Sequence, residues 1–250
     1  MAFSSWRGTM GLIKPTHRPG SLEETIRLLP EGIGVIPMTV GISEGSSREF
    51  HEVLGVIEGY VRQLAEIGVD LIAPAGAPPF MVHGYAGERR ILDRWEQAYG
   101  LPVVTSGVTQ VEAMKALGVS RMVGITYFPD ELNKVFAKYF TDAGITVLEM
   151  AGIDVAFNQV QKLSAHEVYA HAKAAFLRHP DADMIYLLGA GWRVLDIVAV
   201  LEEDLDVPAL HSVAARVWHT QRHFRVGQRT RGFGRLLAEL PPLPQPAVEA

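Results

Sequence analysis

The fold is decided by residues 70–77, Asp70-Leu-Ile-Ala-Pro-Ala-Gly76-Ala77, and by residues 183–190, Asp183-Met-Ile-Tyr-Leu-Leu-Gly189-Ala190. Both runs begin with Asp, continue with apolar residues and reach Gly six residues later. A helical pattern follows each run, and then a strand led by Pro that ends in a polar pair, Thr105-Ser106 or His211-Ser212. The sequence therefore predicts two copies of one strand–helix unit, with the two glycines at equivalent strand ends.

Short runs of β-branched residues alternate with amphipathic stretches along the whole chain, which is typical of parallel sheets covered by helices. The predicted fold class is α/β, with two pseudo-symmetric flavodoxin-like lobes, each a parallel sheet flanked by helices, and a cleft between them. Strands are expected at Thr9–Ile13, Gly34–Met38, Leu71–Ala75, Pro102–Thr105, Met122–Thr126, Thr146–Met150, Met184–Leu188 and Val207–Leu210.

The clearest helix is predicted from Arg48 to Ile67, because its apolar residues recur at helical spacing after a Ser46-x-x-Glu49 capping box. The repeat divides the chain into a first lobe of residues 1–112 plus 213–250 and a second lobe of residues 113–212. The C-terminal segment is then expected to return to the first lobe.

The composition excludes several classes of protein. Hydrophobic residues make up 48% of the 250 and charged residues 20%, an ordinary globular balance. A net charge of −5 argues against a nucleic-acid partner, which calls for a clustered basic surface. No secretory signal opens the chain and no apolar run reaches the ~18 residues of a membrane span. We therefore expect a cytoplasmic protein without a membrane partner, and leave a homo-oligomer open.

Cysteine is absent, which excludes disulfides, thiolate metal sites and a cysteine nucleophile. No G-x-G-x-x-G pattern opens an early helix, and Gly41-x-x-x-Gly45 lacks the Gly-Lys-Ser/Thr of a P-loop. No pair of histidines or carboxylates has the spacing of metal ligands. The sequence thus predicts neither a cofactor nor a metal.

Long stretches of the chain are similar to one enzyme family. They run from Gly11-Leu-Ile-Lys-Pro15 to Gly232-Phe-Gly-Arg-Leu236, and the most specific covers residues 180–196 and continues through Leu205-Asp-Val-Pro208. A second match joins residues 116–119 to the turn from Thr126 to Asn133. The chain resembles the aspartate/glutamate racemase superfamily, within it the branch of arylmalonate decarboxylases and maleate cis-trans isomerases. This resemblance implies a cofactor-independent enzyme acting on a small carboxylic acid.

The positions that carry chemistry in that branch are altered here. Its members use one or two cysteines at the two repeated strand ends, and the decarboxylase keeps only the second, which protonates an enediolate after carbon dioxide leaves. The matching residues are Gly76 and Gly189, which cannot donate a proton. The hydroxyl donors that hold the substrate carboxylate after the first strand end are replaced by Ala77 and Pro78.

Other side chains must therefore supply the proton. His211 is the first candidate, because it ends the last strand at the cleft and an imidazole titrates near neutral pH; the alternative is a structural strand-end residue. Tyr127 is the second, one residue before Phe128, which takes the position of the relatives' cleft tyrosine. His83 is the third, in an apolar loop after Gly76.

Substrate binding is expected around both glycine turns. Arg193 is predicted to hold a carboxylate with two parallel hydrogen bonds, a surface salt bridge being the alternative, and backbone N–H groups to hold an enediolate. The predicted binding residues are Pro15, Thr16, Gly76, Ala77, Gly189, Ala190, Gly191 and Arg193.

The expected function is a cofactor-independent lyase that decarboxylates a small carboxylic or dicarboxylic acid through an enediolate-type intermediate without cysteine. An isomerase or racemase of a small carboxylic acid, similar to maleate isomerase, is the alternative within the superfamily. A non-catalytic binder of small acids on the same fold is the alternative outside enzymes.

Overall fold

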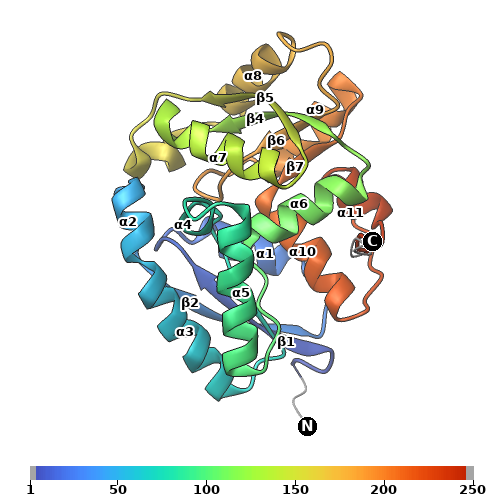
Figure 1. Ribbon diagram of the computed structural model, residues 1–250. Helices are drawn as coiled ribbons and strands as arrows, with labels where there is room; N and C mark the ends of the chain where they lie inside the picture. Colours follow the sequence, from blue (N-terminus) through green and yellow to red (C-terminus); the bar gives the residue numbers. More distant parts are fainter. Residues whose placement is uncertain (1–3, 246–250) are drawn as a thin grey trace, which may run out of the picture.

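Two separate parallel sheets form the framework of the protein, whose computed structural model describes residues 4–245 (Figure 1). The first sheet has the order β2-β1-β3 and the second the order β5-β4-β6-β7, and all the strand pairs are parallel. The strands are β1 (Gly8–Lys14), β2 (Ile33–Thr39), β3 (Leu71–Pro74), β4 (Arg121–Thr126), β5 (Thr146–Gly152), β6 (Met184–Leu187) and β7 (Ala209–His211). The predicted α/β class with helix-flanked parallel sheets is confirmed.

Helices cover the two sheets, and the buried apolar residues divide into one cluster for each sheet. In the first half the helices are α1 (Gly20–Leu28), α2 (Ser47–Glu52), α3 (Leu54–Ile67), α4 (Pro78–Met81), α5 (Tyr85–Tyr99) and α6 (Ser106–Ala116). The second half contains α7 (Asp130–Asp142), η1 (Phe157–Lys162), α8 (Ala165–Phe176), η2 (Leu195–Ile197) and α9 (Val198–Leu205), and the chain ends with α10 (Ser212–His223) and α11 (Arg235–Glu239).

The two aspartates that begin the repeated unit have the same structural role. Asp70 accepts a hydrogen bond of 2.7 Å from the backbone N–H of Thr9, near the start of β1. Asp183 accepts bonds of 2.9 Å from the N–H of Ser120 and 2.8 Å from that of Arg121, at the start of β4. Because β1 and β4 pair with β3 and β6, each aspartate fixes the register of the strand beside its own. The sequence repeat is therefore a structural repeat.

The long helix expected from Arg48 to Ile67 is divided at Val53 into α2 and α3. Phe50 of α2 packs with the apolar cluster of the second sheet, and its ring lies 6.0 Å from that of Phe128. Ile57 and Val61 of α3 belong to the cluster of the first sheet. Val53 keeps a helical backbone, and its N–H and carbonyl still bond to Glu49 and Ile57, so the break is a local irregularity between two ends that pack on different cores.

Residues Pro102–Thr105 do not form the expected strand. A single bridge joins Ile72 to Val103, and Thr105 instead caps α6 by accepting a hydrogen bond of 3.3 Å from the N–H of Val108. This capping bond takes the end of the segment out of extended pairing with β3.

The C-terminal segment lies between the two halves, where α10 packs beside α1 and α6 (Figure 1). Nη2 of Arg216 on α10 donates a 2.7 Å bond to Oγ1 of Thr25 on α1. The N–H of Arg235 on α11 donates 2.7 Å to Glu202 on α9, in the second half. The segment thus contacts both halves, and the lobe boundaries at residues 112 and 213 stay a prediction.

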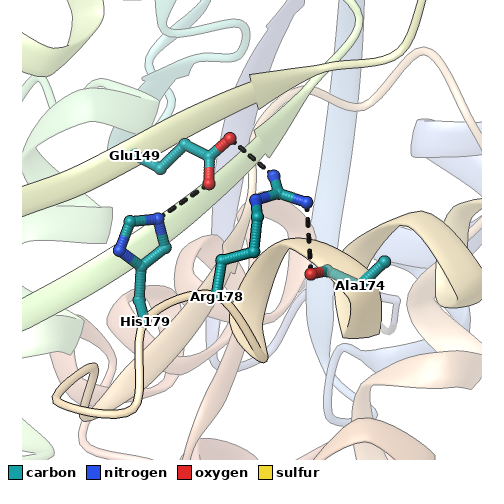
Figure 2. A network of polar contacts seen from close by, with 4 residues as sticks. All are labelled: Glu149, Ala174, Arg178 and His179. Carbon is teal, nitrogen blue, oxygen red and sulfur yellow. Dashed lines mark hydrogen bonds and ion pairs between the residues drawn. The ribbon is translucent and has the colours of Figure 1, made fainter.

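A polar cluster joins the edge strand β5 to the end of α8 (Figure 2). Glu149 accepts hydrogen bonds of 2.6 Å from Arg178 and 2.8 Å from His179. All three side chains are partly exposed, so the cluster contributes little to stability.

Across residues 4–245, no helix combines the length and the apolar character that crossing a membrane would take.

Candidate active site

A cavity lies where the carboxyl ends of strands from both sheets meet, which is where open α/β sheets bind ligands. The space in it that is open to the centre of a water-sized sphere is about 30 Å³, more than the ~10–15 Å³ that a single water needs by this measure. The residues that line it are Pro15, Thr16, Arg18, Ser21, Ile42, Phe50, Gly76, Pro78, Pro79, Tyr127, Phe128, Phe157, Gly189, Ala190 and Gly191. Both glycines of the repeat therefore face one small space.

The first turn, after β3, presents an apolar surface to the cavity. Gly76 has a φ of +88°, and a Cβ added there would lie 2.8 Å from Cγ of Pro15. Its N–H donates a 3.2 Å bond to Oγ of Ser106, so this donor is already bonded within the protein. Pro78 and Pro79 follow and have no N–H to donate. This side of the cavity has few hydrogen-bond donors.

The second turn, after β6, is held by buried donors. Gly189 has a φ of +96°, and a Cβ added there would overlap the hydroxyl oxygen of Tyr127. The carbonyl of Gly189 accepts bonds of 3.1 Å from Nε2 of His211 and 3.0 Å from Nε1 of Trp192. Only glycine fits at this position, because Tyr127 fills the space that a side chain would occupy.

Tyr127 is a buried acid whose hydroxyl donates to no acceptor within residues 4–245. Its hydroxyl oxygen accepts a 3.1 Å bond from the N–H of Gly191, which leaves the hydroxyl proton available to a ligand. Burial raises the pKa of Tyr127 to about 12, although the Gly191 bond and the charge of Arg18 lower it. The phenol is therefore protonated throughout the physiological range.

The turn that carries Tyr127 is rigid. Oγ1 of Thr126 donates 2.7 Å to Oδ1 of Asn133, and Nδ2 of Asn133 donates 2.9 Å to the carbonyl of Phe128. The ring of Trp192 lies edge-on to that of Tyr127 at 4.8 Å. These contacts fix the phenol ring against the second turn.

Arg18 is the cationic side chain of the cavity. Its Nη2 donates to the backbone carbonyl of Phe157, and its guanidinium lies 4.6 Å from the centre of the Phe157 ring. Its Nη1 is buried and has no hydrogen-bond partner among the described residues. A Cβ added at Gly191 would lie 2.7 Å from this nitrogen and 2.8 Å from the oxygen of Tyr127. Two donors thus converge beside Gly191.

A larger groove of about 480 Å³ shares Tyr127, Phe128 and Phe157 with the cavity. The ring of Phe128 lies 4.6 Å from that of Tyr127 and 6.0 Å from that of Phe157. The cavity can hold a group of carboxylate size, and the groove offers an aromatic wall to an apolar substituent.

His211 lies behind the second turn and does not line the cavity. It is fully buried, and its Nε2 donates to the Gly189 carbonyl. Burial lowers its pKa to about 4, with the charge of Arg216 acting in the same direction against the Gly189 bond. This lowered pKa does not support a titration near neutrality, because burial keeps the imidazole neutral, and the catalytic role of His211 stays a prediction. The arrangement makes His211 a support of the turn.

Three other predicted residues also lie outside this cavity. Arg193 is exposed, with its side chain near Gly20 on α1. His83 borders another cavity beside Lys138 and Asp142, and burial lowers its pKa. Ala77 is buried where α4 begins.

The cavity brings together most of the predicted site: Pro15, Thr16, Gly76, Tyr127, Gly189, Ala190 and Gly191. Sequence reasoning missed Arg18, Ser21, Ile42, Phe50, Pro79 and Phe157. For Arg18 the signal was its place three residues after Pro15, in the loop that leaves a predicted strand. Within residues 4–245, no group of three or more His, Asp or Glu side chains could hold a metal ion.

The chain is similar to known proteins over most of its length. The family model described as arylmalonate decarboxylase matches residues 10–237. Arylmalonate decarboxylase of Bordetella bronchiseptica is 25% identical over 237 residues, 92% of this chain and 97% of that protein.

Solved structures show the same fold. The maleate isomerase Iso from Pseudomonas putida S16 superposes with a TM-score of 0.86 at 19% identity, over 93% of this chain and 99% of the other. A crystal structure of arylmalonate decarboxylase gives 0.78 at 22% identity, over 92% and 99%. The predicted resemblance is thus confirmed, and the chain belongs to the arylmalonate decarboxylase family.

Proposed function

We propose that the protein is a cofactor-independent carboxy-lyase that removes carbon dioxide from a small malonate-type acid through an enediolate-type intermediate. The observation that carries this proposal is the asymmetry of the cavity. Its ionisable side chains, Arg18 and Tyr127, converge beside Gly191, whereas Pro15 lies against the other turn, at Gly76, which Pro78 and Pro79 follow. The side with Arg18 and Tyr127 suits the carboxylate that the product retains. The side with the prolines suits the carboxylate that leaves as neutral carbon dioxide.

The apolar side favours bond cleavage for an electrostatic reason. A carboxylate without donors or cations nearby is destabilised relative to water, whereas carbon dioxide is neutral and is not. Charge then moves from the leaving group to the retained carboxylate, beside the donors of the second turn. Preorganised donors stabilise such a developing charge more than they stabilise the ground state.

The proposed step conserves atoms and electrons. The bond between the α carbon and the leaving carboxylate breaks, its electron pair enters the retained carboxylate to form the enediolate, and carbon dioxide leaves. Tyr127 then moves its hydroxyl proton from its hydrogen bond with an enediolate oxygen to the neighbouring α carbon, and the enediolate supplies the electron pair of the new C–H bond. The tyrosinate, stabilised by the N–H of Gly191 and the charge of Arg18, takes a proton from water. The product is a monocarboxylic acid.

The same asymmetry disfavours the superfamily's other reactions. A racemase that works without a cofactor needs an acid and a base on opposite faces of the substrate, and the proline side of the cavity supplies neither. An isomerase that adds a nucleophile to a double bond needs an ionised group. Tyr127 stays protonated because its pKa is about 12.

The test is an NMR assay in deuterated water. The purified protein is incubated with aryl- and alkylmalonates, with single enantiomers of the matching monocarboxylic acids, and with maleate. Release of carbon dioxide with one deuterium at the α carbon supports the proposal. Racemisation or deuterium exchange without carbon dioxide, or conversion of maleate to fumarate, overturns it in favour of a racemase or an isomerase.

A further inference from the structure

We propose that the carboxylate-binding subsite lies at the second turn and is formed by Arg18 together with the hydroxyl of Tyr127. The ligand of this subsite is an ionised carboxylate, the one that the substrate retains. This inference rests on the proposed function for its substrate, and it adds a specificity-determining residue that the sequence comparison does not indicate.

The first observation is the unpartnered nitrogen of Arg18. A buried guanidinium N–H without an acceptor costs free energy, because it has lost its water without replacement. Nη1 is in this state, while Nη2 is satisfied by the carbonyl of Phe157. The missing acceptor is therefore expected on the side of the cavity, and an anion is the best acceptor for a guanidinium.

The second observation is the convergence of two donors on one point. The position of a Cβ built on Gly191 is 2.7 Å from Nη1 of Arg18 and 2.8 Å from the oxygen of Tyr127. Nη1 of Arg18 and the oxygen of Tyr127 are therefore no more than about 5.5 Å apart. Groups at this spacing can bond to the two oxygens of one carboxylate. A side chain at residue 191 would displace both groups, so glycine at this position allows them to lie close together.

The third observation is that Arg18 is held in place without a ligand. Its ring contact with Phe157 is 4.6 Å, and its backbone carbonyl accepts a 2.8 Å bond from Nζ of the buried Lys14. An arginine that is already ordered loses less conformational entropy when it binds a ligand. The side chain is therefore preorganised for binding.

The first turn is poorly equipped for the same task. Gly76 spends its N–H on Ser106, and Pro78 and Pro79 have none. Negative charge is thus favoured at one end of the cavity and disfavoured at the other. A substrate that carries a neutral amide in place of the retained carboxylate should therefore bind weakly.

The experiment measures the binding of malonate and of its monoamide, malonamate, by NMR titration of the full chain. The variants are Arg18→Gln, which removes the charge, Arg18→Lys, which keeps a point charge, and Gly191→Ala, which puts a methyl group where the donors converge. Arg62→Gln on the exposed face of α3 is the matched control for loss of one positive charge. Thermal unfolding of each variant establishes that it is folded.

We expect Arg18→Gln to weaken malonate binding about 10- to 100-fold, the usual range for a hydrogen bond to a charged group. Arg18→Lys should lose less, and Gly191→Ala should also weaken binding because its methyl group displaces Nη1 of Arg18 and the hydroxyl of Tyr127. Wild type should prefer malonate to malonamate, and Arg18→Gln should lose this preference. Arg62→Gln should bind as wild type does.

Equal binding of malonate by wild type and Arg18→Gln, or no malonate binding by wild type, would overturn the inference. So would a loss confined to Arg193→Gln, the arginine that the sequence favours. If carbon dioxide release survives in Arg18→Gln with unchanged malonate binding, the proposed function stands and this inference fails. If malonate binding depends on Arg18 but no malonate is turned over, the inference stands and the proposed function fails.

Discussion

The turn at Gly76 and the turn at Gly189 have nearly the same backbone, with φ values of +88° and +96°. Each turn is hydrogen-bonded to the polar pair at the end of the next Pro-led segment. The first turn bonds to Ser106 and the second to His211. The space beside each glycine differs, because the ring of Pro15 fills one and the hydroxyl of Tyr127 fills the other. A repeated backbone thus fixes where two groups face each other, and the neighbouring side chains decide which turn carries chemistry.

Replacing Tyr127 with Phe should have the largest effect, because it removes the acid of the second turn. We expect the rate of carbon dioxide release to fall about 10²- to 10⁴-fold, the usual size of a general acid contribution. Tyr186→Phe is the matched control, since it removes another buried hydroxyl, one that donates 2.5 Å to Gln110. Similar rates of carbon dioxide release for the two variants would show that Tyr127 is not the acid, and the two turns would then not differ in this chemical role.

Alanine at Gly76 or Gly189 should destabilise the fold through backbone strain and through overlap with a neighbouring side chain. A third glycine, Gly144, separates these two causes. Gly144 has a φ of +91° with nothing within 4 Å of an added Cβ, so Gly144→Ala should cost about 1–2 kcal/mol of backbone strain alone. Gly76→Ala and Gly189→Ala should lose about 1–3 kcal/mol more, from overlap with Pro15 and Tyr127.

Urea unfolding measures these free energies. In a Tyr127→Ala background, the extra cost of Gly189→Ala should disappear while that of Gly76→Ala remains. Equal losses for all three glycines would mean that the space beside the two turns is not tightly filled.

The supports of the two turns should respond differently to pH. Glu88 is fully buried, accepts a 2.6 Å bond from Thr105 beside the first turn, and accepts another from Tyr139. Burial raises its pKa to about 7, although both bonds lower it. Because the folded state binds the proton more tightly than the unfolded state, the stabilisation is complete below pH ~4.5 and declines until about pH 7, by about 3 kcal/mol.

Glu88→Gln keeps the shape of the protonated carboxyl and should remove this decline. The free energy of unfolding, measured in urea from pH 4.5 to pH 8 for both proteins, checks the expectation. A decline of equal slope in Glu88→Gln would assign the titration to another group, such as Glu24, whose pKa burial also raises to about 7.

His211→Gln should have the smallest effect on the rate, because the glutamine amide can still donate to the Gly189 carbonyl. We expect a rate within a few-fold of wild type and the same pH profile. His211→Leu removes the donor and should slow the reaction more, through displacement of the second turn. A 10²-fold loss in His211→Gln would instead make the imidazole a proton donor.

Most of the fold could be predicted from the sequence, because its signals are local. The Asp-to-Gly repeat located β3 and β6, and apolar runs located the other strands. The segment Pro102–Thr105 failed for an equally local reason, since Thr105 serves as a helix cap. The break at Val53 was not predictable, because it depends on which core each half of the helix meets.

The parts of the candidate site that depend on the course of the backbone could be predicted from the sequence. The parts that depend on the direction of side chains could not. Gly76 and Gly189 follow from strand ends alone. Arg193 and Arg18 both lie in loops beside the cleft, yet packing turns the first to solvent and the second onto Phe157. His211 was placed beside the right turn, but only the structure shows that its nitrogen supports a carbonyl.

The phenol that fills the space beside Gly189 has a consequence for the environments in which the site can work. Peroxides convert a catalytic thiolate to sulfenic and then sulfinic acid, and the second change is irreversible for most proteins. The residues that line this cavity include neither Cys nor Met, so two-electron oxidants find no sulfur there. If Tyr127 is the proton donor, as we propose, the chemistry of the cavity is independent of the redox state of its surroundings.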